Sequence, residues 1–216
     1  VCEDTKDLDD IPEYWTAMMR KRLPKVQYTF REISCGVQFL GFADERSLTH
    51  SWLFADYVNE HLKKYNLIAK EGIRQTDNGV EYCGSWSAKK PSAYTLAIES
   101  AKLTHGTIPP GAHRFQSDVE TVHNLIEAEF YEIEDFTDRI NFMEKAHTYQ
   151  LFFNLERPNT YKENKNPWQL AQEKRPDIPK EALMLPPVDL DALLNKKLAY
   201  STQGGYDVFS SPFLRK

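Results

Sequence analysis

Apolar and polar residues alternate over one stretch of the chain in the way expected of a strand. Val26, Tyr28 and Phe30 are separated by polar residues, which is the period of a strand with one buried face. Ser34-Cys35-Gly36 is typical of a turn, and a second strand-like segment, 37–43, follows it. The pattern therefore predicts a hairpin.

Helical periods occur after this hairpin. Thr49 is placed to cap a helix whose apolar residues, from Leu53 to Tyr65, lie on one face. Further strands and helices are predicted at about 72–76, 92–102, 104–108, 118–130 and 135–155. Strands interleaved with helices indicate a layered α/β domain.

The periodic pattern fades beyond Arg157, where polar and proline-rich segments follow. We divide the chain into a folded domain, 1–173, and a Pro-rich extended arm or start of a C-terminal region, 174–216. Because the chain begins at Val1 without a methionine, we expect it to be a fragment. Leucines of the arm are candidates to anchor it on a neighbouring copy: Leu183, Leu185, Leu190, Leu193 and Leu194.

Composition narrows the class of protein. The 216 residues are 41% hydrophobic and 27% charged, which excludes a mostly disordered chain. No apolar run approaches the roughly 18 residues of a membrane helix, so no membrane partner is expected. Three widely spaced cysteines argue against a disulfide framework or a cysteine zinc site. A net charge of -5 argues, taken alone, against a nucleic-acid partner.

Carboxylates stand where several of these elements begin or end. Asp77 leaves a short strand directly into an Asn78-Gly79 turn, although such residues are also common in ordinary surface turns. Asp4 ends a short strand, and Glu120 lies in the first turn of a predicted helix. Acids from two strands and a helix could converge on two Mg²⁺ ions about 3.5–4 Å apart, an arrangement that promotes phosphoryl transfer.

Four motifs carry a resemblance to a known family. They are Cys2-Glu3-Asp4-Thr5-Lys6-Asp7, Thr76-Asp77-Asn78-Gly79-x-Glu81-Tyr82, Val119-Glu120 with His123, and Phe153-Asn154-Leu155-Glu156-Arg157-Pro158-Asn159 followed by Asn166-Pro167-Trp168. In this order they resemble the catalytic core of retroviral-integrase-type DDE transposases, the insertion-sequence enzymes. The resemblance covers about residues 1–173. Each motif alone is a moderately specific sign of the family, and the four motifs in this order are a strong one.

The resemblance implies a fold, a reaction and a site. The fold would be ribonuclease H-like, a mixed five-stranded α/β sheet flanked by helices, with its first three strands as an antiparallel meander. Asp4, Asp77 and Glu120 would be both the catalytic and the metal-binding residues, holding Mg²⁺ or Mn²⁺ as two ions per active site with DNA bound. The reaction would be cleavage of element ends and strand transfer into target DNA.

Partners follow from the same resemblance. They would be double-stranded DNA, as element ends and target, and further copies of the chain in a homo-oligomer. The protein would be cytoplasmic, and associated with the bacterial nucleoid when bound to DNA. A helix-turn-helix region usually precedes the core in this family, and its absence here would explain the missing positive charge.

Several further residues are auxiliary or DNA-binding candidates. Asn78 follows Asp77, and His123 lies one helical turn after Glu120, so it could bond the carboxylate, reach DNA or simply belong to the core. Trp86 is a candidate for stacking on a base. The basic candidates for phosphate contacts are first Arg20, Lys21, Arg22, Lys89 and Lys90, and then Lys25, Lys63, Lys64, Lys162, Lys165, Lys196 and Lys197. Each of them, taken alone, is more often part of a solvated loop.

The sequence departs from the family pattern before and around the glutamate. Gln116 and Ser117 replace the common Asn-Gly, and Asp118 and Thr121 replace the basic residues that often flank Glu120. Two alternatives therefore stay open: a catalytically silent DNA-binding or assembly module of the same fold, and a ribonuclease H-like nuclease without strand transfer. Acidic residues from Glu127 to Asp135 are expected to form a solvated helix face, or a surface that meets another protomer or a basic domain.

Overall fold

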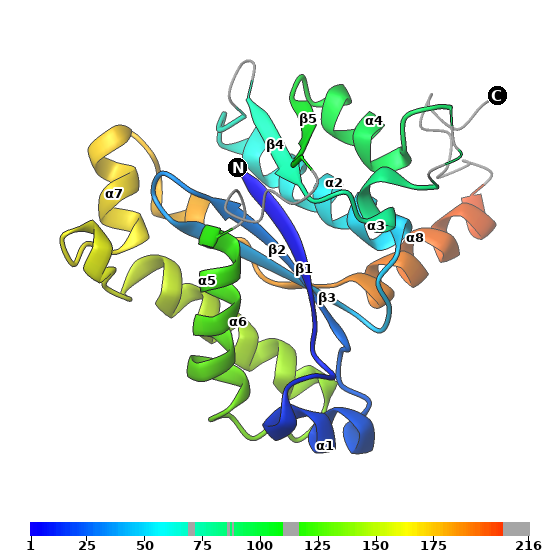
Figure 1. The fold of residues 1–216 in the computed structure, drawn as a ribbon, viewed down its shortest axis with the longest axis horizontal. Coiled ribbons are helices and arrows are strands. Elements are labelled where there is room, and N and C mark those ends of the chain that lie inside the picture. The colour runs from blue at the N-terminus through cyan, green and yellow to red at the C-terminus, as the bar shows by residue number, and fades with distance from the viewer. Residues whose placement is uncertain (69–71, 86, 88, 110–116, 205–216) are drawn as a thin grey trace.

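The computed structural model describes residues 1–68, 72–85, 87, 89–109 and 117–204, with side chains to residue 200. Its strands are β1 (Cys2–Asp7), β2 (Val26–Glu32), β3 (Val37–Ala43), β4 (Ile73–Thr76), β5 (Thr104–Thr107) and β6 (Val188–Asp189). Within the described residues they form one mixed sheet in the order β5-β4-β1-β2-β3-β6, which is the centre of the molecule (Figure 1).

Pairing in the sheet matches the predicted meander. β1, β2 and β3 are antiparallel neighbours, while β4 is parallel to β1 and β5 is parallel to β4. The ribonuclease H-like α/β prediction is confirmed, but a sixth strand joins the five that were predicted. It is the two-residue β6, which pairs in parallel with the free edge of β3, Gly41 lying opposite Val188.

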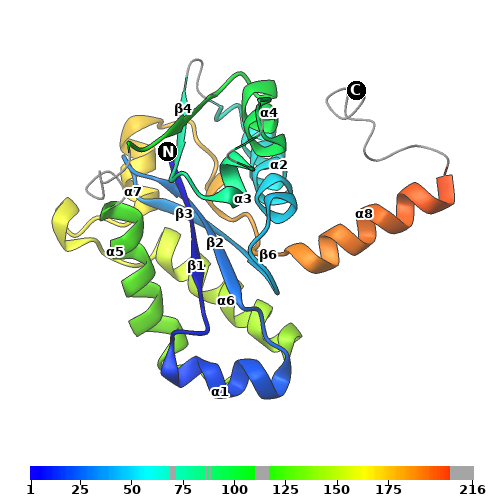
Figure 2. The same ribbon diagram turned by 45° about the vertical axis from the view of Figure 1, so that its right-hand side comes forward.

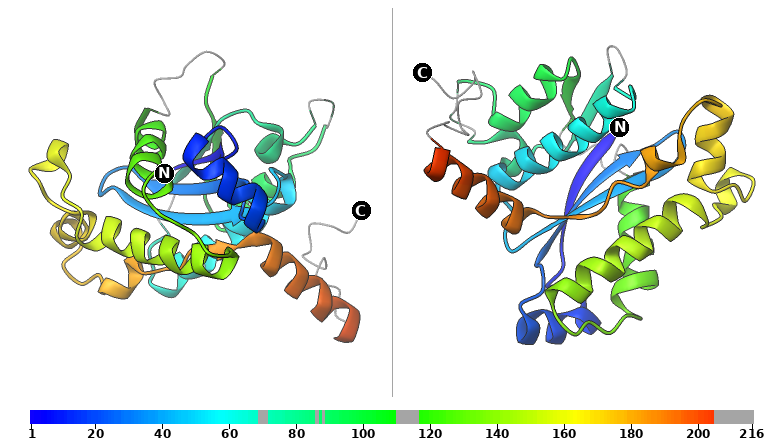
Figure 3. Two further views of the ribbon diagram at one scale, coloured as in Figure 1. Left: turned by 90° about the horizontal axis from the view of Figure 1, so that it is seen from below. Right: turned by 180° about the vertical axis from the view of Figure 1, so that it is seen from behind.

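Helices cover both faces of the sheet (Figure 3). The α-helices are α1 (Pro12–Lys21), α2 (Leu48–Lys64), α3 (Val80–Cys83), α4 (Ala93–Ser100), α5 (Ser117–Ile126), α6 (Arg139–Leu155), α7 (Pro167–Lys174) and α8 (Leu190–Gly204). A π-helical turn, η2 (Glu127–Tyr131), continues α5, and 3-10 turns lie at η3 (Thr160–Lys162) and η4 (Lys180–Leu183).

Two apolar layers hold these helices on the sheet. On one face, which we call the front, Leu40 and Phe42 of β3 pack with an aromatic cluster from α1, η2 and α6 that includes Phe130 and Phe142. On the back, Tyr28 and Phe30 of β2 pack against α2 and its neighbours, where Phe54 contacts Tyr28. Burial on both sides is why the strands exclude water from either face.

This double coverage corrects the prediction that β2 has one solvated face. Its alternate polar residues, Gln27, Thr29 and Arg31, are 0%, 0% and 3% exposed, because α5 and η2 cover them. Periodicity finds polar positions, but it does not show whether another element covers them.

Boundaries and caps differ locally from the predictions. Ser47, not Thr49, caps α2 by accepting from the backbone N–H of His50 at 3.2 Å. α6 begins at Arg139 rather than near 135. Asp138 caps it by accepting from the backbone N–H of Asn141. The polar segment after β1 leads into α1, a helix that was not predicted.

The predicted arm packs against the domain into the first turns of α8, where Leu193 and Leu194 contact the core and Lys197 pairs with Asp56 at 3.0 Å. Leu183, Leu185 and Leu190 are 2%, 5% and 0% exposed in the core of their own chain, which corrects their assignment as anchors for a neighbouring copy. The end of α8 extends away from the body (Figure 2). No helix in the described ranges has the length and apolar character needed to cross a bilayer.

Candidate active site

The order of the sheet brings Asp4 and Asp77 to neighbouring positions. Asp4 lies in the middle of β1, and Asp77 directly follows β4, the strand that is parallel to β1. Cys2 lies opposite Gln75 in this pairing, and two residues further along each chain are Asp4 and Asp77. Glu120 is in the first turn of α5, which contacts β1 on the front of the sheet.

The charge on Asp4 responds to the other two acids. Burial is the largest of the causes that raise the pKa of the Asp4 carboxyl to about 7, and the negative charges of Asp77 and Glu120 contribute to this increase. A hydrogen bond from the backbone N–H of Thr5 and the positive charge of the Arg46 guanidinium act against this increase in pKa. Three acids far apart in the sequence therefore share one electrostatic environment.

Electrostatic proximity is not yet metal coordination. Among the described residues no three His, Cys, Asp or Glu side chains form a group that could hold a metal ion. The donor chemistry nevertheless suits a hard divalent cation, because carboxylate oxygens are the ligands that Mg²⁺ prefers. Asp4 is only partly buried, and the charges of two further acids help to raise its pKa, so a bound cation would relieve their repulsion.

The loop after β4 holds Asp77 by short-range hydrogen bonds. The N–H of Gly79 donates to Oδ1 of Asp77 at 2.8 Å, and the side-chain amide of Asn78 donates to the carbonyl of Ile108 at 2.7 Å. Asn78 thus ties the Asp77 loop to the end of β5. The fold gives Asn78 a positioning contact, and its predicted auxiliary role stays a prediction.

Gly79 is required by space rather than by a left-handed turn. Its φ is -59°, which any residue can adopt. A Cβ at this position would lie 2.4 Å from Oε2 of Glu81 and 2.9 Å from Oδ1 of Asp77. Glu81 is itself buried, accepting from the hydroxyl of Thr5 at 3.0 Å and from Arg46 at 3.3 Å. The motif therefore packs two carboxylates against one glycine.

His123 is part of a buried hydrogen-bond chain on the front of the sheet. Tyr131 donates to Oε1 of Gln27 at 2.6 Å, and the Gln27 amide donates to the hydroxyl oxygen of Thr29 at 2.9 Å. The Thr29 hydroxyl lies 3.0 Å from Nε2 of His123, to which it can donate its remaining proton. This direction leaves the His123 proton on Nδ1, 3.9 Å from Oδ2 of Asp4.

Burial keeps the imidazole neutral. It lowers the pKa of His123 to about 3, with the nearby Lys6 ammonium acting in the same direction. A neutral ring that faces Asp4 at 3.9 Å can orient the carboxylate but does not form a charged pair with it. Sequence reasoning found His123 by its spacing from Glu120, and missed Gln27 and Thr29 because they were expected to face solvent.

Solved structures share this architecture. A chain of the simian T-cell lymphotropic virus intasome, in complex with PP2A regulatory subunit B56 gamma, matches 83% of this chain with a TM-score of 0.55 and 15% identity. This chain covers 56% of that longer chain. The catalytic core domain of BIV integrase matches 80% of this chain and is itself 93% covered, with a TM-score of 0.51 and 14% identity. The chain has the integrase catalytic-core fold.

Sequence comparison alone does not reach this result. No protein-family model matches the chain, and no curated protein matches its sequence. At 14–15% identity the integrase-like fold is shared while most side chains differ. In this integrase-like core the assignment of each acid to a role must rest on the chain's own geometry.

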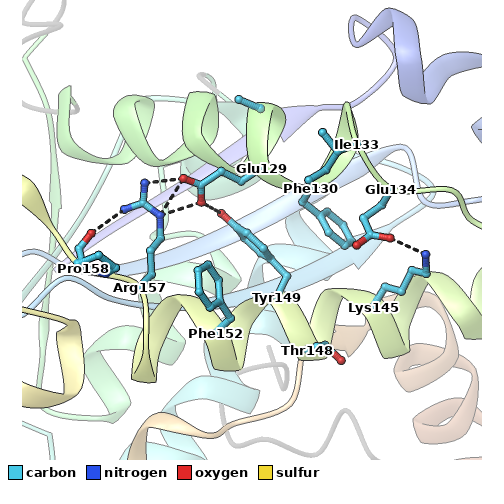
Figure 4. A pocket seen from close by; sticks show the side chains of 11 residues that line it. Glu129, Phe130, Ile133, Glu134, Lys145, Thr148, Tyr149, Phe152, Arg157 and Pro158 are labelled. Carbon is cyan, nitrogen blue, oxygen red and sulfur yellow. Dashed lines mark hydrogen bonds and ion pairs between the residues drawn. The ribbon is translucent and has the colours of Figure 1, made fainter.

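The Asn-x-x-Arg-Pro motif of the integrase-like core joins separate elements. The Asn154 side chain accepts from the N–H of Gln38 and donates to the carbonyls of Gln38 and Leu183. Arg157 donates to both carboxylate oxygens of Glu129 across a surface pocket of about 690 Å³ between η2 and α6 (Figure 4). The motif therefore fixes α6 to β3 and to the end of the α5–η2 helix.

The predicted acidic surface is partly neutralised by such contacts. Glu127 pairs with Lys6 at 2.9 Å, Glu129 with Arg157, and Glu134 with Lys145. These carboxylates are engaged within their own chain, so they are less available to a basic partner than a fully solvated face would be.

The predicted DNA-binding residues lie at the end of α1 and in the segment before α4. Arg20 and Arg22 are exposed at the end of α1, where Lys21 donates to the carbonyl of Phe136. Lys89 and Lys90 are exposed before α4. Their contact with DNA stays a prediction, and the predicted stacking residue Trp86 lies outside the described residues.

Proposed function

We propose that this chain is the catalytic core of a DDE-type transposase or integrase, which cleaves DNA phosphodiesters at element ends and transfers the strands to target DNA. The observation that carries the proposal is the placement of the three acids on an integrase-like fold: Asp4 on β1 and Asp77 after the parallel neighbour β4, with Glu120 in the first turn of α5, which contacts β1. An insertion-sequence element is the source that the four sequence motifs favour.

Asp4, Asp77 and Glu120 would hold two Mg²⁺ or Mn²⁺ ions once DNA is bound. Such ions supply an activated hydroxyl and stabilise the leaving oxygen. The remaining residues of the site position its carboxylates: Gly79 fixes an oxygen of Asp77 through its N–H, and neutral His123 faces Asp4. No nucleophilic side chain is needed, because water and then a freed DNA 3′-hydroxyl would attack.

Assembly follows from the proposed reaction. Joining two element ends requires two active sites, so we propose that the chain acts as a homo-oligomer on double-stranded DNA. Mass measurement by light scattering, with and without paired DNA ends, tests this part of the proposal. A chain that stays monomeric on paired ends while still joining them would contradict it.

Metal binding and DNA cleavage test the active site together. Titration of Mn²⁺ by calorimetry in the presence of DNA should show binding that Asp77→Asn abolishes. Glu120→Gln should lower the cleavage rate by at least about a thousandfold, because it removes a charge that the transition state needs. The melting temperature should change little, since Glu120 is exposed. Unchanged cleavage by Glu120→Gln would refute the assignment.

A catalytically silent module is the second candidate, because the described acids do not form a ready metal-binding group. It predicts no metal-dependent cleavage and no change in metal binding with Asp77→Asn, even when DNA is present. A third outcome, cleavage without joining of DNA ends, would instead indicate a ribonuclease H-like nuclease.

A further inference from the structure

A groove lies beside α5, on the side that leads to the 157–162 segment. It encloses a cavity of about 530 Å³. Its lining includes Asp118 and Thr121, which flank Glu120 in the sequence, and on the opposite wall Arg157, Tyr161 and Lys162. The proposed function has not used this groove, although its wall contains part of the Asn-x-x-Arg-Pro motif.

Strand register places the floor of the groove next to the candidate active site. Arg31 lines the groove and lies opposite Cys2 in the β1–β2 pairing, two residues from Asp4. Thr29, opposite Asp4, contacts His123 on the front of the sheet, and Arg31 shares this face because side chains two residues apart point the same way. The groove thus lies on the same face of the sheet as Asp4 and beside the helix that carries Glu120.

The charges of the groove favour an anionic occupant. Arg31 donates to Asp118 at 2.8 Å, and Arg157 is paired with Glu129, so these charges are balanced. Lys162 is different: its ammonium donates to the carbonyls of Ile33 at 2.6 Å and Ser34 at 3.1 Å. Within the described part of the chain no carboxylate pairs with Lys162, so its positive charge remains available to a ligand.

An exposed aromatic ring adjoins this charge. Tyr161 is 95% exposed and precedes Lys162 in η3, with its ring at the groove. An aromatic face beside a cation is the combination by which proteins hold single-stranded nucleic acid, the ring stacking on a base and the cation contacting phosphate. An acidic or apolar peptide would leave one of these two features unused.

We propose that the groove between α5 and residues 157–162 binds a DNA strand next to the active site, with Lys162 on a phosphate and Tyr161 on an unpaired base. In this proposal Lys162 supplies the positive charge that α5 lacks around Glu120. The position of the strand rests on the proposed function, whereas its binding does not, because contact with phosphate requires no catalysis.

The test measures DNA binding by fluorescence anisotropy with the whole chain in EDTA, where cleavage is absent. The probes are a labelled 20-nucleotide single strand and the same sequence as duplex. Lys162→Met should weaken binding of both probes about fivefold and reduce the slope of log Kd against log salt by roughly 0.7–0.9, the value of one lost phosphate contact. Tyr161→Ala should weaken only the single strand, by about fivefold, because a duplex offers no free base.

Two controls separate the groove from general effects. Lys162→Arg, which keeps the charge, should bind within twofold of the original chain. Lys180→Met removes an exposed lysine on η4 and should leave both probes unaffected. Melting curves identify any variant that fails to fold, in which case Tyr161→Ala carries the test, since its side chain is almost fully exposed.

The outcomes distinguish the groove from the proposed function. Equal effects of Lys162→Met and Lys180→Met, or no binding of either probe by the original chain, would overturn the groove. If Glu120→Gln abolishes cleavage while Lys162→Met leaves Kd unchanged, the active site stands without the groove. If no cleavage is ever seen but Lys162→Met weakens binding as expected, the groove stands as the DNA site of a silent module.

Discussion

Two adjacent residues of β1 carry carboxylates into opposite faces of the sheet. Glu3 points to the back, is 1% exposed, and accepts from Arg74 at 2.9 Å and from Tyr94 at 2.5 Å. Asp4 points to the front, where its nearest charged neighbours include two further acids and where His123 is neutral. The same strand thus has one carboxylate with a cation and a hydroxyl bonded to it, and one whose neighbours include two further negative charges.

The difference separates a structural acid from a functional one. Burial raises the pKa of Glu3, and the Arg74 guanidinium and the Tyr94 hydroxyl oppose that increase. Burial also raises the pKa of Asp4, but there Asp77 and Glu120 add to the increase. A buried acid that the fold leaves uncompensated has a stability penalty, and such residues are concentrated at functional sites.

The largest effect should come from the back of the strand. Arg74→Ala leaves Glu3 buried beside Tyr94 without its cation, which should lower the free energy of unfolding by about 3–5 kcal/mol. Chemical denaturation with urea measures it. The double variant Glu3→Gln, Arg74→Met should recover most of the loss, because two neutral side chains need no charge partner. A loss below 1 kcal/mol in Arg74→Ala would show that this pair does not stabilise the fold.

At the front of the strand, removing the charge of Asp4 should stabilise the chain, whereas the Arg74 substitution at the back destabilises it. The pKa of Asp4 is about 7 in the folded chain, whereas the usual value for an aspartate is 3.8, so between these pH values the folded state retains a proton that the unfolded state has released. The unfolding free energy of the metal-free chain should therefore fall as pH rises from 4 to 7, by up to about 4 kcal/mol from this group. Asp4→Asn should remove this dependence and stabilise the chain at pH 8.

Urea denaturation in EDTA at pH 5 and pH 8 measures the Asp4 effect. Asp10→Asn, at an exposed position after β1, is the matched control and should leave the pH dependence unchanged. A lower stability of Asp4→Asn than of the original chain at pH 8 would mean that Asp4 is a structural acid like Glu3.

A substitution at Gly79 tests how tightly Asp77 and Glu81 pack against this glycine. Gly79→Ala should lower the unfolding free energy by about 1–2 kcal/mol, because the added methyl group displaces the held Glu81 and the Asp77 carboxylate. Its cleavage rate should fall much more than this loss of stability explains, since Asp77 moves. Gly84→Ala is unsuitable as a control, because its φ of +72° adds backbone strain. Gly106→Ala, which meets one side-chain atom of Ile73 at 3.1 Å, serves instead. Equal cleavage by both variants would contradict the prediction.

The smallest effect should come from the buried chain behind His123. Thr29→Val removes a hydroxyl on which both Gln27 and His123 depend, so the unfolding free energy should fall by about 1 kcal/mol. Cleavage should slow about tenfold as the His123 ring loses its fixed orientation toward Asp4. Thr29→Ser keeps the hydroxyl and should behave like the original chain in both measurements. A normal rate for Thr29→Val would show that the chain is structural only.

Sequence patterns predicted the strands and helices that have strong periods. The 26–30 and 37–43 strands and the helix with Leu53 on its apolar face are present, because hydrophobic period reflects burial directly. Predictions failed where local sequence is ambiguous. α1 has buried residues only at Tyr14 and Met18, and β6 has two residues, so neither presents a pattern long enough to detect.

The candidate site divides in the same way. The chain's own residues determined which side chains are available: acids at 4, 77 and 120, a glycine after Asp77, and a histidine one turn beyond Glu120. Only the tertiary structure decided which of them share an environment, since β1 and β4 become neighbours through pairing between residues more than 70 positions apart. It also decided that Glu3 has a bonded cation while Asp4 has two further acids among its neighbours, because the groups that set the charge of each come from distant segments on opposite faces of the sheet.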